Sequence, residues 1–312
     1  MPFSIYSTTG SARMDTLIQQ VINAISLGAI YSLFALGYAM VFSILGVLNL
    51  AHSAIFMMGA FFGLVAINQW GLPLWLAFPI AMLGAGLVSV VLELVAFRPL
   101  RRRNAARISQ LISSIGAAIL LVNITQLIFK QLYNSTEAYL PRDLIPSDPI
   151  IIGNLRVQPV RMLIVLIALV LMVLLQYLVT NTRIGQHMRA VAFNQRIAAL
   201  FGINVSRIFI FTFFLAGVLG GAAGMFYGVV FLNVTPFIGE DVALIGLTAI
   251  VLGGMGSIQG AVLGGFLVAG LQIFSIVIGG SSFRNAVVFL LLFVILLIRP
   301  QGLLGQPEST RA

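Results

Sequence analysis

The chain has 312 residues, of which 60% are apolar and only 8% are charged. Because a soluble domain carries about a quarter charged residues, this composition excludes a soluble globular protein. Apolar runs near the roughly 20 residues needed to cross the hydrocarbon core of a bilayer recur along the chain. The sequence therefore predicts one all-α, polytopic membrane domain over residues 17–300, with about eight to ten transmembrane helices and broken or re-entrant elements.

The charge and the termini set further limits. The formal net charge of +9 suggests nucleic acid, but the arginines cluster in short loops between apolar runs, as the positive-inside rule produces, so we expect no nucleic acid partner. Cysteine is absent from the sequence, which excludes disulfides and metal thiolates, and we expect no metal site. Residues 1–16 are expected to be a polar tail that is not a signal peptide, and residues 301–312 a cytoplasmic tail.

The only lysine, Lys130, does not follow a glycine-rich loop. A Walker A phosphate loop needs a lysine after its glycines, so this chain is not expected to hydrolyse a nucleotide by that route. If ATP drives its activity, another subunit must bind and hydrolyse it.

The first apolar run extends from about Leu17 to Leu50, which is too long for one straight span. We expect a span followed by a broken half. Asn49 and His52 then lie in an otherwise apolar stretch, where polar groups need a partner or a cavity. They either join helices by hydrogen bonds or line a translocation pathway, and both interpretations stay open.

The next span, about residues 74–97, runs into a basic loop that we place in the cytoplasm. Its arginines are Arg98, Arg101, Arg102, Arg103 and Arg107. Glu93, just before the loop, is expected to pair with one of them. A span over residues 108–129 then leads to an external loop, residues 130–160, and the span 160–179 returns to the cytoplasm.

Residues 182–207 carry four arginines and no acid between two apolar runs, and are predicted to be a cytoplasmic segment. Asn194 is a suitable cap for a short helix, Ile197, Leu200 and Phe201 form one apolar face, and Gly202 can end the helix in the left-handed conformation. Such a helix is too short to cross a bilayer. It is either a knob held at the membrane surface or an amphipathic connector on anionic lipid.

The run after Arg207 crosses outward, and its recurring glycines and alanines predict close helix packing. Glu240 and Asp241 then favour the start of a helix through its dipole, or contact a soluble partner. A short apolar segment, residues 242–252, is interrupted by glycines, which is typical of a discontinuous element at a pathway. The pathway residues predicted here are Gly253, Gly254, Gly256 and Ser257. Two further crossings place the C-terminus in the cytoplasm.

Several stretches in order resemble the LivH-type permease subunits of ATP-binding-cassette (ABC) importers for branched-chain and other hydrophobic, neutral amino acids. The resemblance covers nearly the whole chain from about Leu17. It rests on Gly28–Tyr31 with Gly37, Asn49-Leu50-Ala51-His52, Arg98-Pro99-Leu100-Arg101, Gly185, Arg189-Ala190, Asn194, Ala198, Leu200, Gly202-Ile203, Gly253–Gly265 and Arg299–Gly305. Ser53 departs from the family, which usually has glycine there.

The resemblance implies an ABC importer permease fold in a bacterial inner membrane and a non-catalytic transport subunit without a cofactor of its own. It also implies a second, related permease, two cytoplasmic ATPases that bind ATP, and an extracytoplasmic binding protein. The coupling segment to the ATPase would comprise Arg189, Asn194, Gln195, Arg196, Ile197, Ala198, Leu200, Phe201 and Gly202. The binding protein is expected to dock on outer loops that include Arg142, Asp143, Glu240 and Asp241.

Two alternatives remain at this point. The same class of importer carries urea or short amides in close relatives. A different class, an ion-coupled secondary transporter or channel, usually needs acids within the membrane, whereas Glu93, Glu240 and Asp241 are expected near interfaces.

Overall fold

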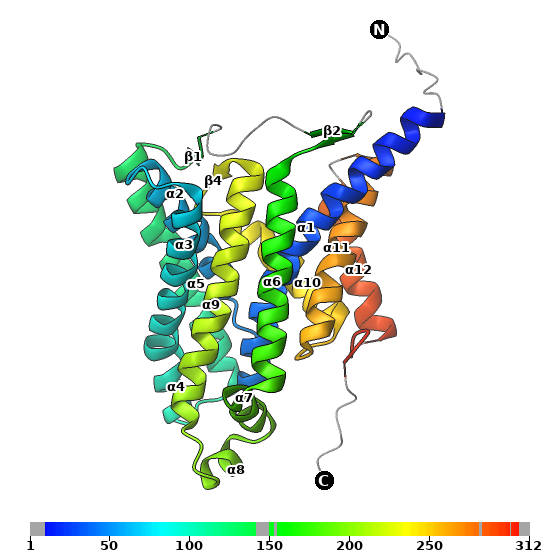
Figure 1. Cartoon of the computed structure of the whole chain (residues 1–312). Coiled ribbons are helices and arrows are strands. Elements are labelled where there is room, and N and C mark those ends of the chain that lie inside the picture. The colour runs from blue at the N-terminus through cyan, green and yellow to red at the C-terminus, as the bar shows by residue number, and fades with distance from the viewer. Residues whose placement is uncertain (1–9, 142–149, 153–154, 281–282, 300, 306–312) are drawn as a thin grey trace.

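The computed structural model describes residues 10–141, 150–152, 155–280, 283–299 and 301–305. Within these ranges, six helices are long and apolar enough to cross a membrane, and two shorter apolar helices accompany them. They lie side by side in one bundle (Figure 1). The prediction of an all-α polytopic membrane protein is confirmed, whereas six helices of the described residues, fewer than the eight to ten expected, are long enough to be candidate spans.

The first helix, α1 (Gly10–Leu45), is one continuous element of 36 residues. Residues 17–45 lie in this one helix and the chain breaks at Gly46, with its φ of +66°, but no half-span follows before residue 50, so that part of the prediction was wrong. The helix runs obliquely through the bundle in Figure 1, and tilting accommodates a stretch longer than the bilayer thickness. It also begins within the predicted tail 1–16, at Gly10.

Three helical elements follow α1. Helix α2 (His52–Asn68) precedes α3 (Leu74–Leu92), which continues through a π-helical turn, η1 (Glu93–Phe97), into α4 (Arg98–Arg102). The expected partner of Glu93 is Arg101, whose Nη2 lies 2.7 Å from a fully buried Glu93 carboxylate oxygen. This ion pair fixes the turn on which the basic loop begins. Helix α5 (Arg107–Tyr133) then runs back along the bundle.

Four short strands lie at one end of the bundle, called here the hairpin end. Strand β1 (Ala138–Tyr139) pairs with β4 (Asn233–Val234), and β2 (Ile150–Ile152) pairs with β3 (Leu155–Val157), both antiparallel. Helix α6 (Pro159–Asn181) leads from there to the opposite end, where α7 (Arg183–Phe193) and α8 (Gln195–Leu200) lie. We call that the α8 end (Figure 1).

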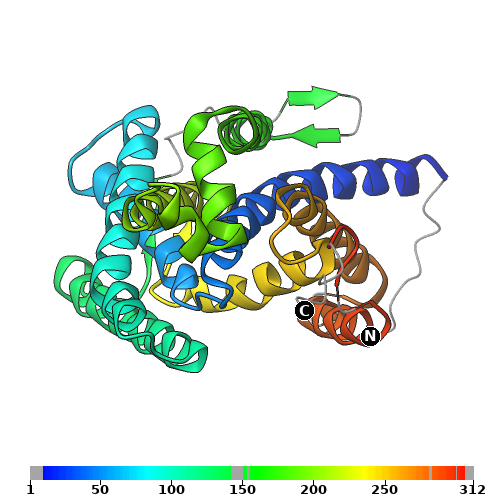
Figure 2. The same cartoon turned by 90° about the horizontal axis from the view of Figure 1, so that it is seen from below.

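The last four helices complete the bundle. Helix α9 (Val205–Phe231) returns to the hairpin end, and α10 (Ile238–Gly253), α11 (Ile258–Gly279) and α12 (Arg284–Ile298) follow. Figure 2 shows the bundle from the α8 end. Helices α9 and α10 lie in the middle; α3 and α5 lie on one side of them, and α11 and α12 lie on the other side.

The predicted interruption after residue 252 is present. Gly254 and Gly256 adopt φ values of +110° and +86°, which L-residues with a side chain rarely adopt. Ser257 then caps α11 by accepting a hydrogen bond from the Gly260 amide. Residues of the predicted C-terminal tail hydrogen bond to the backbone at this break: the Leu303 and Leu304 amides donate to the carbonyls of Leu252 and Gly253.

Helix α9 forms the centre of the fold by packing against α2 and α3. Its small residues permit this approach, as predicted: a β-carbon at Gly224 would overlap the Phe56 carbonyl oxygen, and one at Gly217 would meet Ser89. The Ser89 hydroxyl also donates to the Phe213 carbonyl oxygen at 2.6 Å. Backbone-to-backbone contact therefore joins the three helices.

We predict that Gly224→Leu lowers the thermal midpoint of the purified protein, because overpacking a tight contact costs about 1–3 kcal/mol or more. Gly116→Leu is the matched control, since Gly116 is an exposed helical glycine whose β-carbon would meet no atom within 4 Å. Size-exclusion chromatography after heating measures both midpoints. Equal midpoints for the two variants would show that the contact of α9 with α2 is not tight.

Candidate functional site

The connector between α6 and α9 is held in place by side-chain hydrogen bonds to the backbone. The Thr182 hydroxyl accepts a hydrogen bond from the Gly185 amide and so caps α7. The Arg189 guanidinium donates to the Val179 carbonyl, which lies near the end of α6. These bonds fix the direction in which α7 leaves the bundle.

Helix α8 has the predicted cap and end. The Asn194 Oδ1 accepts hydrogen bonds from the Arg196 and Ile197 amides, both at 3.0 Å. Gly202 ends the turn with a φ of +80°. Both local predictions are confirmed, because capping depends on neighbouring residues alone.

The outward face of α8 is apolar. Leu200 and Phe201 are each 82% exposed and Ile197 is 45% exposed, whereas Ala198 is buried. Arg189 and Arg196 are exposed beside this face. A cluster of large exposed apolar side chains with a basic rim is typical of a surface that contacts another protein or a membrane.

The start of α8 is tied to the end of α1. The Gln195 side-chain amide donates to the Ile44 carbonyl at 3.0 Å. Beside it lies a polar pocket of about 250 Å³, lined by Leu45, Arg101, Asn104, Ala105, Gln110 and Gln195. Sequence reasoning missed this pocket, because its residues come from three segments far apart in the chain.

Asn49 and His52 are both buried within protein. The His52 ring stacks on Phe34 at 5.0 Å between centroids, and its Nε2 lies 3.2 Å from the Phe34 carbonyl oxygen. Gly37 and Gly220 leave room for this ring. The Asn49 amide is buried without a hydrogen-bond partner among the described residues.

The other predicted site residues lie on separate elements. Gly253, Gly254, Gly256 and Ser257 form the turn between α10 and α11, packed against residues 301–305. Glu240 and Asp241 are exposed in the first turn of α10 at the hairpin end, and α10 has no side-chain cap hydrogen bond. Arg142 and Asp143 lie outside the described residues.

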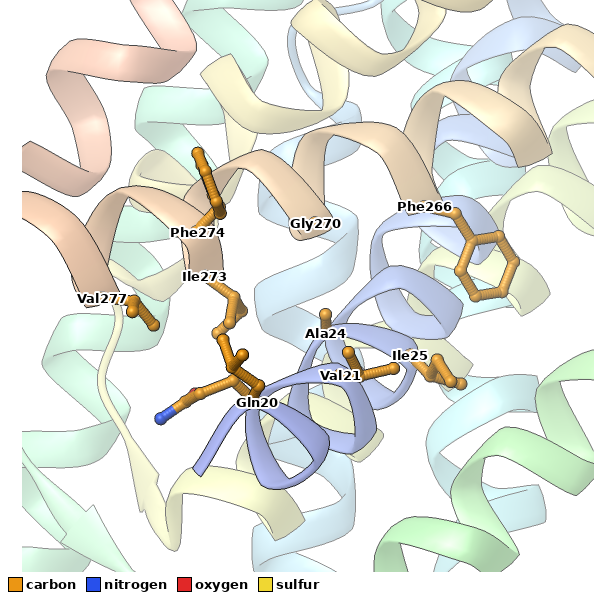
Figure 3. A pocket seen from close by; sticks show the side chains of 10 residues that line it. Gln20, Val21, Ala24, Ile25, Phe266, Gly270, Ile273, Phe274 and Val277 are labelled. Atoms are coloured by element: carbon orange, nitrogen blue, oxygen red, sulfur yellow. The ribbon is translucent and has the colours of Figure 1, made fainter. Parts of the chain in front are cut away.

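An apolar groove of about 370 Å³ lies between parts of α1 and α11 (Figure 3). Val21, Ile25 and Phe266 are among its walls, and Gln20 is its one polar lining residue. Because the lining contains no ionisable group, the groove can accommodate an apolar chain but cannot recognise a charged one.

Comparisons with known proteins agree with this architecture. The family described as "Branched-chain amino acid transport system / permease component" matches residues 20–298. The chain is 33% identical to the high-affinity branched-chain amino acid transport system permease protein BraD of Pseudomonas aeruginosa, over 93% of this chain and 96% of BraD. It is 31% identical to LivH of Escherichia coli, again over 93% and 96%, and 25% identical to a LivH protein of Methanocaldococcus jannaschii over 88% of each.

A bundle of membrane-length helices with a short, exposed apolar helix at one end defines a multi-pass membrane protein. The chain belongs to the family of permease components of branched-chain amino acid transport systems. The resemblance stated from the sequence is thereby confirmed.

We predict that Asn194→Ala loosens α8, because loss of an N-cap side chain costs about 1 kcal/mol. Hydrogen–deuterium exchange of residues 195–200 should become several-fold faster, whereas Asn194→Asp should retain slow exchange. The matched variant Asn204→Ala removes the corresponding cap of α9, where Asn204 accepts from the Arg207 amide. If Asn194→Ala leaves exchange in residues 195–200 unchanged, the cap does not hold α8 in shape.

Proposed function

We propose that this chain is the non-catalytic membrane subunit of an ATP-driven importer for branched-chain and other neutral amino acids. It would pair with a second, related permease in the bacterial inner membrane, with two ATPases on the cytoplasmic side and a binding protein outside. The α8 end and the C-terminus would then be cytoplasmic. ATP would be bound by the ATPase subunits, with no cofactor in this chain.

The observation that carries the proposal is the apolar face of α8. Leu200 and Phe201 extend beyond the ends of the long helices and are the most exposed large apolar side chains of the described chain. Full burial of one such side chain in a partner's groove stabilises a complex by about 1.5–3 kcal/mol. The exposed arginines beside them suit an acidic rim on that partner.

The proposed mechanism follows from how α8 is connected. ATP would draw the two ATPases together and displace α8. The displacement would pass into α9, which continues from α8, and into α1 through the Gln195–Ile44 hydrogen bond. Because α9 packs closely on α2 and α3, these helices would move as one body. The surroundings of Asn49, His52 and the Gly253–Ser257 turn would then change their exposure, as proposed for a pathway.

The alternatives receive less support. The relatives above are named as branched-chain amino acid permeases, which favours amino acids over urea or short amides. Glu93 is neutralised by Arg101, while Glu240 and Asp241 are exposed at a helix end. Such acids do not suit an intramembrane site for a coupling ion.

We predict that Leu200→Asp and Gly202→Pro abolish ATP-dependent leucine uptake into membrane vesicles while the protein still inserts. Ile184→Asp is the control, because Ile184 is an exposed apolar residue of the neighbouring α7. If α8 docks on an ATPase, the control transports normally. Normal uptake by Leu200→Asp would exclude the docking role, and equal losses in all three variants would indicate a lipid-bound connector instead.

A further inference from the structure

Four helices contribute polar side chains to one cluster in the half of the bundle nearer the hairpin end. Arg284, at the start of α12, donates from Nη2 to the Tyr31 hydroxyl of α1 at 2.7 Å. The Tyr31 hydroxyl donates to Oε1 of Gln272 in α11 at 3.0 Å. The Tyr227 hydroxyl of α9 is close enough to Arg284 for the two groups to interact electrostatically. Residues as much as 253 positions apart are thus joined by hydrogen bonds.

The cluster has more donors than acceptors. Among the described residues, no carboxylate lies within ion-pair distance of the half-buried Arg284. Gln272 is fully buried, and its Nε2 has no hydrogen-bond partner there. A half-buried cation without a carboxylate partner and a buried amide donor without an acceptor are both costly, and both would be satisfied by an anionic group.

The cluster is accessible from the hairpin end. Tyr227 and Arg284 are partly exposed, whereas Tyr31 and Gln272 form its buried floor. The exposed carboxylate of Asp241, in the first turn of α10, is close enough to Tyr31 and Tyr227 to act on them electrostatically. The positive and negative groups are therefore contributed by different helices, α12 and α10.

Aromatic rings adjoin the polar groups on one side. The Tyr227 ring lies 4.4 Å from that of Phe231 and 5.6 Å from that of Phe56, between centroids. Phe56 in turn lies 5.1 Å from Phe34, which stacks on His52. A continuous run of aromatic contacts therefore extends from Tyr227 into the buried core of the bundle.

We propose that Arg284, Tyr31, Tyr227 and Gln272 bind the α-carboxylate of an amino acid entering from the hairpin end. Its apolar side chain packs on Tyr227 and Phe231. The inference rests on the proposed function and adds to it a binding site for the cargo within this subunit. A purely structural role, in which Arg284 ties α12 to α1, does not account for the unpartnered donor of Gln272.

Gln272→Glu separates the two roles. A glutamate keeps an acceptor for Tyr31 and adds a charge beside Arg284, so the fold should be as stable as before or more stable. The same charge repels a carboxylate and removes the free donor. We expect the variant to weaken binding of L-leucine at least tenfold while its thermal midpoint does not fall.

The measurement is saturation-transfer NMR of L-leucine and L-leucinamide on the whole transporter complex in nanodiscs, without the binding protein. Wild type should bind L-leucine but not L-leucinamide, which lacks the carboxylate. Arg284→Met should also lose L-leucine. Arg161→Met is its matched control, because Arg161 likewise begins a helix and hydrogen bonds to α1, from Nη1 to Asn23 Oδ1 at 2.8 Å.

ATP-driven leucine uptake by the wild-type complex is measured in parallel, with the binding protein present. If wild type takes up leucine while Gln272→Glu binds it unchanged, the site is wrong and the proposed function stands. Binding of leucinamide as strongly as leucine would also overturn the site. If wild type takes up no leucine, the proposed function fails and the site fails with it.

Discussion

The close contact of α9 with α2 and α3 is the constraint on which the rest of the structure depends. In a bilayer, apolar surface alone does not hold helices together, because lipid tails are equally apolar. Glycines such as Gly224 instead bring backbones into direct contact. Helix α9 follows the α8 connector at one end and carries Tyr227 in its last two turns at the other. This contact therefore links the two ends of the molecule mechanically.

The features that the sequence predicts are those with local causes. The positions of the spans follow from apolar length, the cap of α8 from Asn194, and the break after α10 from its glycines. The half-span expected within residues 17–50 is absent because Gly37 leaves room for His52 without breaking the helix, and because a tilted helix can exceed the bilayer thickness. The Tyr31–Gln272–Arg284 cluster was not predictable, since it joins residues more than two hundred positions apart, each unremarkable in its own span.

The two ends of the helix bundle differ in a way that suits directed transport. At the α8 end, apolar side chains stand exposed beside arginines, which suits docking to another protein. In the half nearer the hairpin end, Arg284 has no carboxylate partner among the described residues and lies beside the buried Tyr31 and Gln272, which suits an anionic group. Near the α8 end, the ion pair of Arg101 with Glu93 neutralises the buried acid, so the interior offers an apolar solute few competing charges.

The central claim, that α8 docks on an ATPase, is tested most directly by photo-crosslinking. A photoreactive amino acid replaces Phe201 in the protein in its native membrane, and the adducts are identified by mass spectrometry. The account predicts an adduct with an ABC ATPase subunit, lost when α8 is interrupted by Gly202→Pro. Adducts with lipid alone would contradict the account and identify α8 as a connector on the membrane surface.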